Sequence, residues 1–177
     1  MKTLLNKEQL NITLQRLAHQ LVENHLSFKN TAIIGIQPRG ILLSDRIAGL
    51  VKKITGNKHI DYGTLDITFY RDDVQSRNIH IPADTNMPFT IEGKQVILVD
   101  DVLYTGRTIR SAMDALLDFG RPEKVELLTL IDRRFSRELP IQPDYIGHTV
   151  DTILTQRVIV YWKEKDGKDE VVLIDKV

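Results

Sequence analysis

The chain has 177 residues, of which 42% are hydrophobic and 27% charged, a composition typical of one soluble globular domain spanning residues 1–177. Its 24 basic and 24 acidic side chains cancel to a net charge of zero, which disfavours a surface that attracts nucleic acid overall but leaves room for a local basic patch. The absence of cysteine excludes disulfides, thiolate metal sites and cysteine nucleophiles. No apolar run approaches the ~20 residues of a membrane helix and no signal-peptide core is present, so we expect a cytoplasmic protein without a membrane segment.

The first predicted element is a helix near the N-terminus. Asn6 and Gln9 have the spacing of a capping box. The apolar residues that follow recur on one helical face: Leu10, Leu14, Leu17, Ala18, Leu21 and Val22. Arg16 and His19 lie off this face and share an exposed flank. From the sequence alone, a solvated surface is the favoured interpretation of these two residues.

Thr31–Ile36 predicts the first core strand, followed by a turn at residues 37–40 and a helical pattern that stops at Gly56. Arg39 in this turn therefore lies at the carboxyl end of a strand, the edge at which open α/β sheets bind ligands. It could be an ordinary surface residue. A guanidinium at this edge is better explained as a clamp for phosphate oxygens, which it binds in pairs.

Tyr62–Tyr70 alternates between apolar and polar residues, which predicts an edge or half-buried strand. The next segment, Arg71–Pro88, has no periodicity and contains two prolines. A polar segment of this length is typical of a functional lid or a disordered loop. Arg71 is either a ligand-binding residue at the strand's end or a plain solvated arginine.

Val96–Thr108 carries the strongest signal in the chain. Four apolar residues predict a strand buried on both faces, and Asp100 and Asp101 follow where the apolar run stops. A helix then begins after a turn whose Thr105 and Gly106 provide a hydroxyl and room for close approach. Unpaired backbone N–H groups and the positive end of the helix dipole favour a phosphate at such a helix start.

The two carboxylates need another role, because they repel phosphate. Ribose hydroxyls or a hydrated divalent cation would suit them, so the stretch as a whole fits a ligand that carries a phosphate and a ribose. The alternative is a solvated strand-to-helix turn. A P-loop and a dinucleotide fingerprint are excluded, since neither glycine pattern occurs.

The remaining chain predicts a helix after Thr108, ending near Gly120, and a central strand at Val125–Ile131 that ends in the charged residues 132–134. The segment up to Val150 is expected to be irregular. Gln156–Trp162 and Glu170–Asp175 predict a C-terminal hairpin turning around residues 166–167.

Val96–Thr108 resembles the phosphoribosyl-pyrophosphate (PRPP) motif of type I phosphoribosyltransferases. A wider likeness is carried by seven segments: Leu17–His19, Gly35–Ile41, Asp66–Asp73, Asp100–Thr108, Met113–Leu116, Gly120–Pro122 and Arg137–Ile141. With these segments, nearly the whole chain resembles the PyrR family, pyrimidine-operon regulators that also have uracil phosphoribosyltransferase activity.

The resemblance implies an α/β protein with the type I phosphoribosyltransferase fold: a mostly parallel sheet flanked by helices, a small hood at about residues 133–158, and a C-terminal hairpin. It also implies a homodimer or homotetramer. The implied reaction transfers the phosphoribosyl group of PRPP to uracil, giving UMP and pyrophosphate. Mg²⁺ would be held through PRPP and water near Asp100 and Asp101, without direct protein ligands.

In that family Asp100 and Asp101 would act catalytically on the ribose, and Arg39 and Arg71 would neutralise the pyrophosphate. The full set of expected substrate-binding residues is Pro38, Arg39, Arg71, Asp100, Asp101, Val102, Leu103, Tyr104, Thr105, Gly106, Arg107, Thr108, Arg133 and Val158.

The family's RNA-binding function would use Arg16, His19 and Arg137. Gln15, Pro38, Ser136 and Gln142 depart from the family pattern, and each lost cation removes a phosphate contact. Two alternatives follow: a regulator that binds the pyrimidine-operon mRNA leader and senses UMP or PRPP with weak catalysis, or a phosphoribosyltransferase for another base.

Overall fold

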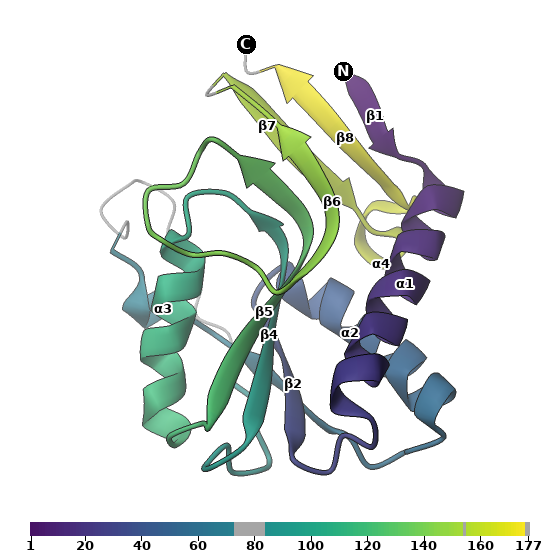
Figure 1. The fold of residues 1–177 in the computed structure, drawn as a ribbon. Helices are drawn as coiled ribbons and strands as arrows, with labels where there is room; N and C mark the ends of the chain where they lie inside the picture. The colour runs from purple at the N-terminus through teal and green to yellow at the C-terminus, as the bar shows by residue number, and fades with distance from the viewer. Residues whose placement is uncertain (73–83, 154, 176–177) are drawn as a thin grey trace.

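The computed structural model describes residues 1–72, 84–153 and 155–175, and within them a main sheet of five parallel strands in the order β3, β2, β4, β5, β6 (Figure 1). These strands are β2 (Thr31–Ile36), β3 (Asp61–Leu65), β4 (Gln95–Leu103), β5 (Lys124–Arg134) and β6 (Tyr145–Asp151). The expected α/β class and parallel sheet are therefore confirmed.

Helices cover both faces of this sheet. α1 (Lys7–His25) and α2 (Gly40–Thr55) lie on one face, and α3 (Arg107–Leu116) lies on the other (Figure 1). Side chains of β4 alternate between the two resulting cores, with Ile97 facing α1 and α2 and Leu98 facing α3. The run of apolar residues in β4 is explained by this burial on both faces.

A second sheet, three-stranded within the described residues, joins the two ends of the chain in the order β1, β8, β7 (Figure 1). Its strands are β1 (Lys2–Leu5), β7 (Gln156–Tyr161) and β8 (Glu170–Asp175). The predicted C-terminal hairpin is confirmed, with the one-turn helix α4 (Lys163–Asp166) and a left-handed Gly167 between its strands. β1 was not predicted.

Two predicted segments differ from the structure. Only the first half of Tyr62–Tyr70 lies in the edge strand β3; Thr68–Tyr70 forms the 3₁₀ turn η1, because the Asp66 carboxylate accepts hydrogen bonds from the backbone N–H and hydroxyl of Thr68. The segment up to Val150, expected to be irregular, contains β6, which is the fifth strand of the main sheet. A second short 3₁₀ turn, η2 (Leu117–Phe119), follows α3.

The expected hood range, 133–158, therefore includes a main-sheet strand, while the small sheet comes from both chain ends. The role of this range above a base stays a prediction. Residues 73–83 of the expected lid, including Asp73, lie outside the described residues. In the part of the chain that the structure describes, no helix is long and apolar enough to cross a membrane.

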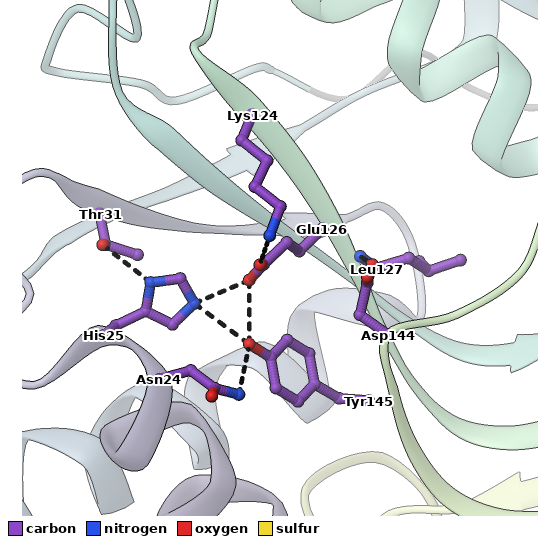
Figure 2. Close-up of polar contacts among 8 residues, drawn as sticks. All are labelled: Asn24, His25, Thr31, Lys124, Glu126, Leu127, Asp144 and Tyr145. Carbon is purple, nitrogen blue, oxygen red and sulfur yellow. Dashed lines mark hydrogen bonds and ion pairs between the residues drawn. The ribbon is translucent and has the colours of Figure 1, made fainter.

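A polar network lies at the amino ends of the main-sheet strands β2, β5 and β6 (Figure 2). The Glu126 carboxylate lies 2.7 Å from Nε2 of His25, accepts a 2.9 Å hydrogen bond from the Tyr145 hydroxyl, and pairs with Lys124 at 2.5 Å. Thr31 contacts the other ring nitrogen of His25. Burial alone would raise the pKa of Glu126, but hydrogen bonds from Lys124, Tyr145 and His25 outweigh it and lower the pKa.

Candidate active site

The carboxyl ends of β2 and β4 bring Arg39 next to Asp100 and Asp101. α2 starts at Gly40, where an added Cβ would lie only 2.4 Å from the Val99 carbonyl oxygen. Only glycine permits this approach of the helix start to β4. The turn residue Pro38 is exposed, after a cis peptide bond from Gln37.

Two pockets open on either side of the Asp-Asp pair, with Val102 in the wall of both. The first, about 270 Å³, is lined by Arg71, Asp100 and residues 102–109. The second, about 180 Å³, is lined by Arg39, Asp101, Val102 and residues 157–160 of β7. The first pocket therefore contains the predicted phosphate loop, and the second lies between the main sheet and the small sheet.

Asp100 and Asp101 are only 8% and 6% exposed. Burial and the neighbouring Asp101 charge raise the pKa of Asp100 well above its usual range, against the opposing effects of the Asp101 backbone N–H and the Arg71 charge. Burial raises the pKa of Asp101 to about 6, and the charge of Arg39 acts in the opposite direction. The pair is thus held where a cation or a developing positive charge would be strongly favoured.

The predicted phosphate loop, residues 104–108, has backbone carbonyls that accept hydrogen bonds from residues 137–139. Gly106 has φ +93° immediately before α3, a conformation that favours glycine. The Thr105 carbonyl accepts backbone hydrogen bonds from Glu138 (3.0 Å) and Leu139 (3.2 Å). The Tyr104 carbonyl accepts one from the Arg137 guanidinium. The loop carbonyls are therefore fixed by residues 137–139.

Several predicted binding arginines already have partners within the protein. Arg107 pairs with Glu138 and Asp72, each at 2.6 Å, at an exposed position. Arg137 pairs with Asp132 and is therefore part of the phosphate-loop support. Arg71 lines the first pocket, where its charge acts on Asp100.

Arg133 is buried beside the same loop, at 4% exposure. Its guanidinium stacks on the Tyr104 ring at 4.0 Å and donates to the Thr152 hydroxyl (3.0 Å) and the Gln156 carbonyl (2.9 Å). Burial lowers its pKa. Arg133 therefore ties the end of β5 to the start of β7.

Among the described residues, β8 is the strand that pairs with β7, along one edge, and the other edge of β7 faces the second pocket. The Gln156 carbonyl accepts from Arg133, and the Val160 carbonyl accepts from Arg39 at 2.8 Å. Backbone groups repeat every second residue along a strand, so the N–H and C=O of Val158 point toward this same edge.

Arg157 also lines the second pocket, and sequence reasoning missed it. The only available signal was an arginine inside the mostly apolar stretch Gln156–Trp162. Its position at the site depends on how β7 is placed against β4, which the sequence alone does not specify.

The three expected RNA-binding residues lie on different elements. Arg16 and His19 are exposed on α1, where Arg16 donates to the Gly147 (2.5 Å) and Ile146 (3.2 Å) carbonyls of β6. Nδ1 of His19 lies 2.8 Å from the Gln15 carbonyl. Arg137, by contrast, is engaged at the phosphate loop.

A protein-family model and known relatives each match most of this chain. The model of the phosphoribosyl transferase domain matches residues 1–165. The Bifunctional protein PyrR of Elusimicrobium minutum is 49% identical over 99% of this chain and 97% of the relative, and that of Microcystis aeruginosa is 45% identical over 97% and 96%.

Among solved structures, a hypoxanthine phosphoribosyltransferase from Staphylococcus aureus superimposes with a TM-score of 0.72 at 20% identity, covering 96% of this chain and 90% of that one. The hypoxanthine phosphoribosyltransferase of Trypanosoma cruzi gives a TM-score of 0.72 at 14% identity, covering 100% and 98%. At such identities the likeness concerns the fold alone.

Proposed function

We propose that this chain, which belongs to the PyrR family and has the type I phosphoribosyltransferase fold, transfers the phosphoribosyl group of PRPP to uracil, giving UMP and pyrophosphate. The supporting observation is the pair of pockets that meet at two buried carboxylates. One pocket has the predicted phosphate loop, and the other has the Arg39 guanidinium and the edge of β7 opposite β8.

The sugar phosphate of PRPP would bind at residues 104–108, where backbone N–H groups at the start of α3 and the Thr105 hydroxyl are donors. Arg39, fixed by the Val160 carbonyl, would bind the pyrophosphate oxygens, with Arg71 reaching them from the first pocket. The ribose hydroxyls would then lie at Asp100 and Asp101.

Uracil would pair with the N–H and C=O of Val158, because an imide edge offers one N–H donor beside a carbonyl acceptor. Its N1 forms the bond to C1 of the ribose while the bond from C1 to the pyrophosphate oxygen breaks, and the N1 proton leaves. Positive charge develops on the ribose ring in the transition state. Asp100 and Asp101 would stabilise that charge from fixed positions.

The donor set is compatible with Mg²⁺. Among the described residues there is no group of three or more His, Cys, Asp or Glu side chains that could hold a metal ion. Two adjacent carboxylates suit an ion that keeps several waters and takes other ligands from substrate phosphates. Bound there, Mg²⁺ would neutralise charge on the leaving pyrophosphate.

The test measures UMP formation from uracil, PRPP and Mg²⁺. Asp100→Asn and Asp101→Asn should each lower kcat by about 100-fold or more, because each removes charge stabilisation of the transition state. Asp61→Asn is a matched control at the amino end of β3, where Asp61 pairs with Lys94, and should retain activity. A wild-type protein that converts other bases but not uracil would contradict the assignment of uracil.

A second function, binding of a pyrimidine-operon leader RNA, is favoured by the exposed Arg16 and His19 on α1. RNA binding here would depend on a local cluster, because the chain has no net charge. Its affinity should fall steeply with salt as phosphate contacts are lost.

The RNA test uses a leader hairpin at 50 and 200 mM salt, with and without UMP, the concentrations being roughly those over which phosphate contacts are weakened. His19→Ala should weaken binding, whereas Lys53→Ala, on the exposed part of α2, should not. Arg16→Lys is preferable to alanine, because Arg16 also holds β6. Equal binding of an unrelated hairpin would argue against a specific RNA function.

A further inference from the structure

Arg157 differs from the other arginines around the second pocket. The guanidinium of Arg39 is held by Val160, and that of Arg133 by Thr152 and Gln156. Arg157 is exposed and lines the pocket, and its guanidinium makes no hydrogen bond or ion pair with any residue that the structure describes. Its side chain is therefore not part of the scaffold of the site.

The geometry of β7 determines where this side chain lies relative to a bound base. A planar ring that pairs with the edge of β7 lies beside the strand, close to the plane of the sheet. The Val158 side chain points into the core and is 7% exposed. Because side chains alternate, Arg157 and Ile159 project on the opposite face of the small sheet. The side chains of Arg157 and Ile159 therefore lie against one face of a ring bound at this edge.

No aromatic side chain lines the second pocket among the described residues, so a planar group that stacks on a bound base there has to be something other than an aromatic ring. A guanidinium is planar, weakly hydrated for a cation, and stacks on nucleobases in place of an aromatic ring. Ile159 is half-buried beside it and extends the apolar part of this surface. On the side of β4, Val102 covers the pocket.

We propose that Arg157 stacks on the uracil ring and so contributes to base binding, an inference that rests on the proposed function. Arg157 contributes through its plane, whereas Arg39 contributes charge to the pyrophosphate. The two arginines therefore have separable roles, although they line the same pocket.

Three substitutions separate a flat surface from a positive charge. Arg157→Ala should raise the Kd of UMP and the KM of uracil about tenfold, with little change in the KM of PRPP, because base stacking is lost. Arg157→Phe restores a plane without charge and should recover most of the affinity. Arg157→Lys keeps the charge without the plane and should behave like alanine.

Arg134→Ala is the matched control, because Arg134 is an exposed arginine paired with Asp151 outside both pockets. The proposal is overturned if lysine at position 157 preserves UMP binding while phenylalanine does not, or if all three variants bind UMP as the wild type does. A selective rise in the KM of PRPP would assign Arg157 to the pyrophosphate instead and would also overturn it. Failure of the wild type to bind UMP would reject the proposed function, and this inference with it.

Discussion

Asp101 combines near-complete burial with a charge that the proposed reaction requires. Burial raises its pKa to about 6, above the value of ~3.9 for a free aspartate. The folded protein therefore holds this proton more tightly than the unfolded chain. The resulting stability is fully present below about pH 4 and is lost as the pH rises toward 6.

Asp101→Asn should therefore stabilise the ligand-free protein above pH 6 although it lowers kcat. The gain in the free energy of unfolding has an upper bound of roughly 3 kcal/mol, from a pKa shift of about two units. Urea denaturation between pH 4.5 and 8 measures it. Asp114→Asn, at an exposed position on α3, is the control and should leave the pH dependence unchanged. A loss of stability in Asp101→Asn above pH 6 would contradict the expectation.

Much of the candidate site could be predicted because its residues are close in sequence. Asp100, Asp101 and residues 102–108 form one strand-to-helix turn, and the rule for parallel sheets places Arg39 at the same edge. The partners of Arg107 and Arg137 could not be predicted. Glu138 and Asp132 reach these arginines only through the path of the chain after β5.

At the scale of elements, the sequence predicted long helices and buried strands better than short edge strands. β6 has a mixed burial pattern and follows two prolines, so its alternation is weak. Its start is defined by a tertiary contact, in which the Asp144 carboxylate accepts a hydrogen bond from the Leu127 backbone N–H. β1 is four residues long and exists by pairing with β8, which is distant in sequence.

The network at the amino ends of β5 and β6 should make stability depend on pH in the acid range (Figure 2). The folded-state pKa of Glu126 is lowered, so its contribution is present above the unfolded value of ~4.3 and is lost as the pH falls through the folded value. Glu126→Gln should cost about 1–3 kcal/mol at pH 7, because it weakens charged hydrogen bonds from His25 and Tyr145.

Chemical denaturation from pH 3 to 7 measures this effect, and the difference between Glu126→Gln and wild type should shrink at the acid end. Glu123→Gln is the control, since Glu123 is exposed just before β5. Both variants should keep the wild-type KM values, because the network lies at the opposite end of the strands from Asp100 and Asp101. A constant difference across this range would show that packing, not ionisation, carries the effect.

At the scale of the whole molecule, the two pockets depend on different sheets. The predicted phosphate loop follows β4 of the main sheet, whereas Val158 and Arg157 belong to β7 of the small sheet. That small sheet is completed by β1, which pairs with β8 and brings the N-terminal residues beside the C-terminal ones (Figure 1). The first residues of the chain thus support the strand on which the base would bind.

Leu5→Ala tests this dependence. Leu5 is 6% exposed and packs into the core shared by α1, α2 and β7, so its truncation should lower the free energy of unfolding by about 2–5 kcal/mol. Because β1 then holds β8 and β7 less firmly, the KM of uracil should rise more than the KM of PRPP. Leu4→Ala is the matched control: Leu4 lies on the same strand but is only partly buried, and both losses should be smaller. Equal changes in the two KM values would mean that the small sheet does not act on the base pocket separately.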